Sequence, residues 1–209
     1  MDDGVDSIEW LGHASFKIGG ETVVYLDPFR IKRDEEADII LISHSHFDHF
    51  SLDDIKKVQK PETQILLTGD CTPKPEGRIT LVKPGDKLRI KGLEIEAVPA
   101  YNTNKPFHPK EKGWVGYLLT IDGEKIYFAG DTDRIPEMKE IKADIGLLPV
   151  SGTYVMTAEE AAEAALDLEL KIAIPMHYGK PGLVGTVNDA DKFKGYLQGR
   201  VEVVLKQAK

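Results

Sequence analysis

Four side chains that commonly bind metal ions stand within six positions of this chain. They are His44, His46, Asp48 and His49, in the segment Ser-His-Ser-His-Phe-Asp-His. The whole sequence holds only six histidines, so three of them in one short segment form a specific pattern. Three imidazoles and a carboxylate suit zinc, iron or manganese. The segment therefore predicts a metal centre and makes a metal-dependent hydrolase the first functional hypothesis.

Other candidate ligands are found at corresponding places along the chain. Each stands just past an apolar run that predicts a strand: residues 44–49 after 38–42, Asp131 after 125–129, His177 after 171–176, and Tyr101, Asn102 and His108 after 93–98. Strand ends gathered at one edge of a sheet are where proteins build ligand sites on rigid supports. We therefore expect these segments to meet.

The strands that must position these side chains are short. They are predicted at residues 8–11, 15–18, 22–26, 38–42, 64–68, 79–82, 87–90, 93–98, 114–121, 125–129, 144–150, 171–176 and 201–205. Helices are predicted from the N-cap Ser51 to 59, from the capping box at Thr157 to 168, and from the N-cap Asn188 to Gly199. A β-rich first half followed by alternating strands and helices suits two mixed sheets packed face to face, with helices outside.

Composition narrows the class of partner. The net charge is −8, which disfavours tight binding to nucleic acid, although bound divalent cations would still let the site take a phosphate-bearing substrate.

Cys71 is the only cysteine, which excludes an internal disulfide and predicts a cytoplasmic protein. No apolar stretch is long enough to span a membrane, and 209 residues suit one domain.

These motifs resemble those of the metallo-β-lactamase superfamily. The matching positions are His-x-His-x-Asp-His at residues 44–49, Gly-Asp-Thr at 130–132, and the late strand-end His177. Asp27 resembles the structural aspartate that the family has early in the chain. The length and the opening Trp-Leu-Gly-His at residues 10–13 look like the group of predicted metal-dependent hydrolases that includes an ascorbate-phosphate lactonase. The resemblance implies a single domain over residues 1–209, of α/β (α+β) class, folded as a four-layer αββα sandwich.

The resemblance also implies a ligand set for two divalent metal ions. His44 and His46 would bind the first metal, Asp48, His49 and His177 the second, and Asp131 would bridge them. The spacing agrees, because positions two apart in an extended segment face the same side. Zinc is favoured, with manganese or iron as alternatives.

One position departs from the family pattern. The third histidine of the first metal usually follows the strand at residues 93–98, but Tyr101 and Asn102 stand there. We expect the loop to fold back so that His108 supplies the missing imidazole. If it does not, Asn102 or water would complete the site, and the chain could hold a single metal.

The function implied is hydrolysis of an ester, lactone or phosphoester bond by a metal-bound hydroxide, with Asp48 as the catalytic residue that orients it. The alternatives are a nuclease or phosphodiesterase of the same fold and a non-catalytic metal-binding protein. The substrate would be a small molecule that could be anionic, with Lys180 and Arg134 as candidates to steer it. No stable nucleic-acid partner and no membrane partner are expected. The natural substrate and the oligomeric state cannot be read from the sequence.

Four further polar residues near these motifs have simpler interpretations. Asp70 and Asp133 are interpreted as caps or turn residues, and Asp27 as a residue that holds loops. His13 could donate to a metal ligand or stabilise a turn, and the sequence does not separate these roles.

Overall fold

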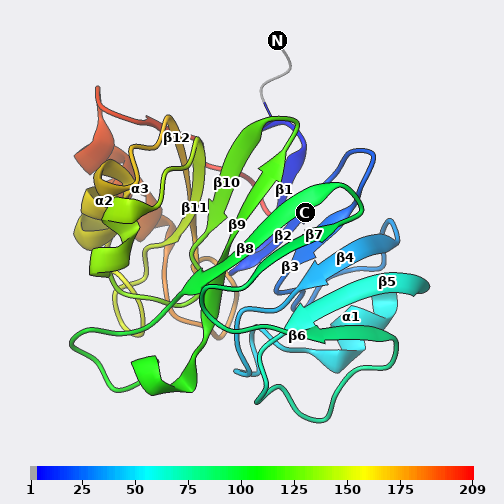
Figure 1. Ribbon diagram of the computed structural model, residues 1–209. Coiled ribbons are helices and arrows are strands. Elements are labelled where there is room, and N and C mark those ends of the chain that lie inside the picture. The colour runs from blue at the N-terminus through cyan, green and yellow to red at the C-terminus, as the bar shows by residue number, and fades with distance from the viewer. Residues whose placement is uncertain (1–3) are drawn as a thin grey trace.

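Two mixed β-sheets stack face to face in the computed structural model, which describes residues 4–209 (Figure 1). The first sheet has the order β1-β2-β3-β4-β5-β6, and the second has the order β13-β12-β11-β10-β9-β8-β7. The strands of the first sheet are β1 (Ile8–Gly12), β2 (Ser15–Ile18), β3 (Val24–Leu26), β4 (Ala37–Leu41), β5 (Gln59–Leu67) and β6 (Arg78–Leu81). Those of the second are β7 (Lys87–Ile90), β8 (Leu93–Pro99), β9 (Val115–Ile121), β10 (Glu124–Phe128), β11 (Ile145–Pro149), β12 (Ile172–Met176) and β13 (Glu202–Val203).

Helices cover the outer faces of both sheets. The α-helices are α1 (Leu52–Val58), α2 (Ala158–Asp167) and α3 (Val187–Leu197), and two 3₁₀ turns are η1 (Lys110–Lys112) and η2 (Pro136–Glu140). In Figure 1, α1 lies beside the first sheet, whereas α2 and α3 lie on the opposite side of the molecule, against the second sheet. The predicted αββα sandwich is thus confirmed. None of the helices in residues 4–209 has the length and apolar character needed to cross a membrane.

The burial of strand β4 explains why apolar and polar residues do not alternate along residues 38–42. Successive side chains of a strand point to opposite faces. Ile39 and Leu41 join the core between the sheets, whereas Ile40 and Ile42 join a second cluster with Ile55 of α1. Both faces of β4 are therefore buried, which holds the segment that follows it on a rigid support.

Side-chain caps start the helices largely as predicted. Ser51 accepts a hydrogen bond from the Asp54 N–H, and Thr157 forms a capping box with Glu160. The predicted start of the last helix is wrong, because Thr186 and not Asn188 is the N-cap. The Asp189 carboxylate accepts from the Thr186 N–H at 2.8 Å, so it satisfies a donor that the helix itself cannot pair.

Hydrogen bonds tie the two sheets together at the edge where the candidate ligands follow their strands. The Val115 N–H donates to the Ser43 carbonyl at 3.1 Å, and the Tyr117 hydroxyl donates to the Ile42 carbonyl at 2.8 Å. On the other side of this edge, the His177 N–H donates to the His13 carbonyl at 2.9 Å. The ends of β4, β9 and β12 are therefore held in register across the sandwich.

Candidate metal centre

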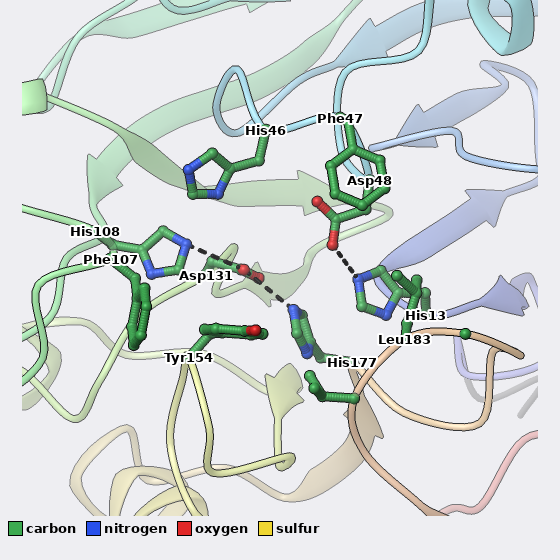
Figure 2. Close-up of a pocket in the computed structure, with 12 residues that line it drawn as sticks. His13, His46, Phe47, Asp48, Phe107, His108, Asp131, Tyr154, His177 and Leu183 are labelled. Atoms are coloured by element: carbon green, nitrogen blue, oxygen red, sulfur yellow. Dashed lines mark hydrogen bonds and ion pairs between the residues drawn. The ribbon is translucent and has the colours of Figure 1, made fainter.

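The seven residues predicted as metal ligands lie together at this edge. They come from the segment after β4 (His44, His46, Asp48 and His49), the loop between β8 and β9 (His108), the end of β10 (Asp131) and the end of β12 (His177). His44, His46 and His108 form one compact group, and Asp48, His49 and His177 form another with His13. Figure 2 shows His46 and His108 on one side of Asp131 and His177 on the other.

Asp131 lies between the two groups. Its carboxylate oxygens are 3.1 Å from Nε2 of His177, 3.2 Å from Nε2 of His108 and 3.3 Å from Nε2 of His49. Two donors that share one zinc ion, each about 2.0–2.2 Å from it, stand roughly 3.2–3.5 Å apart in a tetrahedral site. The separations of 3.2 and 3.3 Å lie in this range, and the 3.1 Å separation from His177 is just below it.

Unpaired polar atoms test whether these residues suit a metal. Nε2 of His44, His49 and His108 and Oδ1 of Asp131 are buried without a hydrogen-bond partner among the residues that the structure describes. Buried polar atoms in proteins are almost always paired, since an unpaired one costs about 1–3 kcal/mol. The three imidazole nitrogens lie within 4.0 Å of the Asp131 carboxylate, so these atoms fit divalent cations, which would accept their lone pairs.

Hydrogen bonds behind the rings determine which nitrogen faces the centre. The Ser43 hydroxyl donates to Asp27, so its oxygen accepts from Nδ1–H of His44 at 2.8 Å. Nδ1 of His49 donates to the same Asp27 carboxylate at 2.7 Å. A neutral imidazole with its proton on Nδ1 carries its lone pair on Nε2, which is the arrangement that metal binding needs.

Asp27 thus does more than hold loops, the role expected from the sequence. It is fully buried, and its Oδ1 accepts from the Ser43 N–H at 2.7 Å while its other oxygen serves Ser43 and His49. Its oxygens already have hydrogen-bond donors, so we assign it to orienting the histidines and not to binding metal. The only sequence signal for this role is its position at the end of an apolar run beside β4.

The shifted pKa values favour a neutral His44 and an ionised Asp131, the forms in which these two side chains bind metals. Burial lowers the pKa of His44 well below its ordinary value, and the neighbouring His49 adds to this effect. Burial would raise the pKa of Asp131, but the imidazoles of His177 and His49 hold it well below its usual range. Burial would lower the pKa of His49, but the carboxylates of Asp131 and Asp27 hold it well above its ordinary value, so a metal would bind His49 by displacing its proton.

The loop after β8 folds back and presents His108. Asn102 Oδ1 accepts from both the backbone N–H of His108, at 2.9 Å, and its Nδ1–H, at 3.0 Å. The Asn102 amide in turn donates to Asp133 at 3.0 Å, and Lys105 pairs with the same carboxylate at 2.6 Å. Asn102 is therefore turned toward His108 and not toward the centre, and Asp133 anchors the loop, a role that its interpretation as a cap or turn residue missed.

We expect Asn102→Ala to lower metal affinity about 10- to 100-fold, because the ring of His108 loses the acceptor that orients it. Chelator competition with zinc measures this effect. Asn104→Ala is the matched control, since Asn104 is an exposed asparagine of the same loop. Equal affinities for the two variants would show that His108 needs no such support or is no ligand.

Trp114 forms the wall behind the first group. Its ring centroid lies 4.9 Å from that of His44 and 4.7 Å from that of His46. Asp70 accepts from Trp114 Nε1 at 2.7 Å and from the Ser45 hydroxyl at 2.8 Å. Asp70 therefore fixes this wall from behind, although the sequence suggested only a cap.

His13 combines the two roles that the sequence left open. Its Nε2 lies 3.0 Å from Oδ2 of Asp48, and its ring stands 4.1 Å from that of His177. Its carbonyl accepts from both the His177 N–H and Trp10 Nε1, each at 2.9 Å. One residue thus orients a candidate ligand and joins the β1–β2 turn to the end of β12.

A pocket of about 340 Å³ opens onto the centre (Figure 2). Its lining includes His46, Asp48, His108, Asp131 and His177. Structural zinc sites are closed by protein ligands, whereas catalytic sites keep a position open. The pocket therefore gives a small molecule access to the side chains that would hold the metals.

Known proteins share this sequence and fold. The family model described as "Beta-lactamase superfamily domain" matches residues 7–177. A UPF0173 metal-dependent hydrolase from Thermococcus onnurineus is 30% identical over 215 residues, covering 95% of each chain. Another from Thermoplasma acidophilum is 33% identical over 210 residues, covering 93% of this chain and 91% of the relative. The crystal structure of a Parabacteroides distasonis protein matches with a TM-score of 0.84 at 34% identity, covering 97% of this chain and 93% of that one.

Proposed function

The chain belongs to the metallo-β-lactamase superfamily and is a metal-dependent hydrolase, and we propose that it cleaves an ester, lactone or phosphoester bond of a small molecule. The observation that carries the proposal is the set of unpaired ligand atoms around Asp131, at the floor of an open pocket. A purely structural metal site is closed by protein ligands and would not open onto a pocket.

The donor set supports two cations, with zinc favoured and manganese or iron as alternatives. His44, His46 and His108 would hold one, Asp48, His49 and His177 the other, and Asp131 would be shared. Divalent cations bound here would lower the pKa of water so that a nucleophile exists at neutral pH, and would polarise the scissile group.

Asp48 is the residue that we assign to proton transfer. Its carboxylate borders the pocket, and His13 holds Oδ2 in place at 3.0 Å. A fixed carboxylate at this position can accept a proton from the attacking water and return it to the leaving group. The buried imidazoles and Trp114 behind them exclude bulk water from the opposite side of the centre.

We expect Asp48→Asn to lower kcat/KM about 100-fold, because the amide cannot accept the proton. A panel of chromogenic carboxylic esters, lactones, thioesters and phosphodiesters, assayed with zinc, manganese or iron added, measures the rates and identifies the bond. Metal content is measured on the same samples to separate lost chemistry from lost metal. Asp53→Asn, an exposed aspartate at the start of α1, is the control. Equal rates for Asp48→Asn and wild type on every substrate would remove the hydrolase mechanism.

A further inference from the structure

Three exposed aromatic side chains surround the mouth of the pocket. Phe47, Phe107 and Tyr154 are 66%, 42% and 38% exposed, and all three line it. They come from three separate segments: the one after β4, the loop between β8 and β9, and the loop between β11 and α2. Single exposed apolar residues are ordinary, but a cluster at the entrance to a catalytic centre indicates a binding surface.

This aromatic rim, formed by Phe47, Phe107 and Tyr154, is held in place before any ligand arrives. The rings of Phe107 and Tyr154 meet edge to face, with centroids 4.7 Å apart. The Asn102 amide donates to the Tyr154 carbonyl at 2.9 Å, so the two loops are also joined through their polar groups. Figure 2 shows Phe107 and Tyr154 beside His108, with Leu183 on the opposite side of the pocket. A preformed apolar wall costs little ordering entropy when a substrate binds.

Cationic side chains do not take part in this surface. Within the described part of the chain, no lysine or arginine lines the pocket. Lys180 donates to the Leu11 carbonyl at 3.0 Å, and Arg134 pairs with Asp167 at 2.6 Å, so both candidates for steering an anion are already engaged. Lys105 is held by Asp133. An anionic group remote from the scissile bond would therefore meet aromatic carbon and no counter-charge.

We propose that the pocket selects an uncharged carboxylic ester or lactone whose acyl or aryl group is apolar and packs against Phe47, Phe107 and Tyr154; this rests on the proposed function. Hydrolysis breaks the bond between the acyl carbon and the ester oxygen. The water oxygen joins the acyl carbon, one of its protons passes through Asp48 to the leaving alkoxide, and the products are an acid and an alcohol. The aromatic rim then acts on binding, and so on KM, more than on the chemical step.

Chain length and charge can be varied separately with p-nitrophenyl esters. Acetate, butyrate and octanoate vary the apolar length, and the p-nitrophenyl monoester of suberic acid carries a carboxylate on an eight-carbon chain. We expect kcat/KM to rise about fourfold per methylene until the pocket is filled. We expect octanoate to exceed the suberate monoester by at least about tenfold, because the distal carboxylate would be desolvated without a partner.

Variants of the rim test which residues cause the preference. Phe107→Ser and Tyr154→Ser are expected to raise KM for octanoate several-fold and to raise KM for acetate less, because the short acetyl group reaches less of the rim. Tyr196→Ser is the matched control, since Tyr196 is a comparably exposed tyrosine (44%) on α3 and does not line the pocket. A flat or falling dependence on chain length, or a preference for the suberate monoester or for phosphoesters, would overturn the proposal.

Binding of octanamide, an uncharged amide that resists hydrolysis, separates this proposal from the hydrolase function. Ligand-observed NMR is expected to show octanamide bound to wild type and weakened several-fold by Phe107→Ser. If no ester, lactone, thioester or phosphodiester of the panel is cleaved but octanamide binds in this way, the proposed hydrolysis fails and the apolar site stands. If esters are cleaved without a chain-length preference and octanamide does not bind, the apolar site fails and the hydrolase function stands.

Discussion

Asp131→Ala is expected to lower kcat/KM about ten-thousandfold and to leave the purified protein with less than one metal ion per chain. One carboxylate faces the Nε2 atoms of His49, His108 and His177, so its removal affects both proposed ions. Metal ions contribute several kcal/mol to stabilising the transition state, and about 1.4 kcal/mol corresponds to a tenfold change in rate. Losing a shared ligand should therefore have the largest effect of any single substitution.

Metal content by mass spectrometry and hydrolysis rates on the same preparation check this prediction. Asp191→Ala is the control, since Asp191 is an exposed aspartate in α3, where alanine also suits the helix. If Asp131→Ala retained two metals and full activity, Asp131 would be a structural residue and the shared-ligand arrangement would be wrong.

Asp27→Asn is expected to lower metal affinity about a thousandfold while leaving the fold in place. The estimate combines two misoriented ligands, each worth about 10- to 100-fold in affinity. Asparagine has the shape of aspartate but offers one acceptor and one donor group. The Asp27 oxygen that accepts from the Ser43 N–H must stay an acceptor, so the new amide NH₂ group has to face Ser43 Oγ and His49 Nδ1.

That orientation reverses the protons on two histidines. Nδ1 of His49 must now accept, which moves its proton to Nε2 and removes the lone pair from the metal side. The Ser43 oxygen also accepts from the amide, so its hydroxyl proton turns to Nδ1 of His44 and reverses that ring as well. This substitution replaces one atom of a fully buried side chain, so it acts through tautomers and not through packing.

Chelator competition gives the affinity, nitrogen NMR of the imidazoles gives the tautomers, and thermal denaturation of the metal-free proteins checks that the fold is retained. Asp38→Asn is the control, since Asp38 also accepts a backbone N–H, from Val23, but contacts lysines and no histidine. Wild-type affinity in Asp27→Asn, with both rings keeping Nδ1–H, would refute this account.

Elements governed by near neighbours lie where the sequence predicts them. The predicted strand at residues 87–90 is β7 (Lys87–Ile90), and the capping box at Thr157 opens α2 (Ala158–Asp167). The predicted strands at residues 114–121 and 125–129 are β9 and β10, which a tight turn across Asp122 and Gly123 joins as a hairpin. In each case alternation, a cap or a turn pair acts over a few residues, so the sequence contains the whole cause.

Elements governed by distant partners were predicted less well. Strand β5 begins at Gln59, five residues before the predicted start at 64, although residues 59–62 are polar and include Pro61. Gln59 pairs with Ala37, and the Thr63 hydroxyl donates to the Ala37 carbonyl at 2.6 Å. Strand β13 covers only Glu202–Val203 of the predicted 201–205, because only these residues pair with β12.

The candidate site also has parts that the sequence predicts and parts that it does not. The candidate ligands after β4 lie within six positions of one another, so their spacing alone predicts a metal. The supports of the site are not contiguous: Asn102 and Asp133 are 31 positions apart, and Asp70 and Trp114 are 44 apart. No local pattern marks a hydrogen bond between such residues, and only the folded chain shows that Asp27 serves two of the rings.

The bridging of the two sheets at the ligand edge has a thermodynamic consequence. The segment after β4 in the first sheet supplies His44, His46, Asp48 and His49, whereas the second sheet supplies His108, Asp131 and His177. Each ion would clamp one half of the sandwich to the other, and the unfolded chain offers no comparable preassembled chelate. The free energy of metal binding therefore adds to the free energy of folding. Removal of the metals would lower the stability of the whole fold as well as the activity.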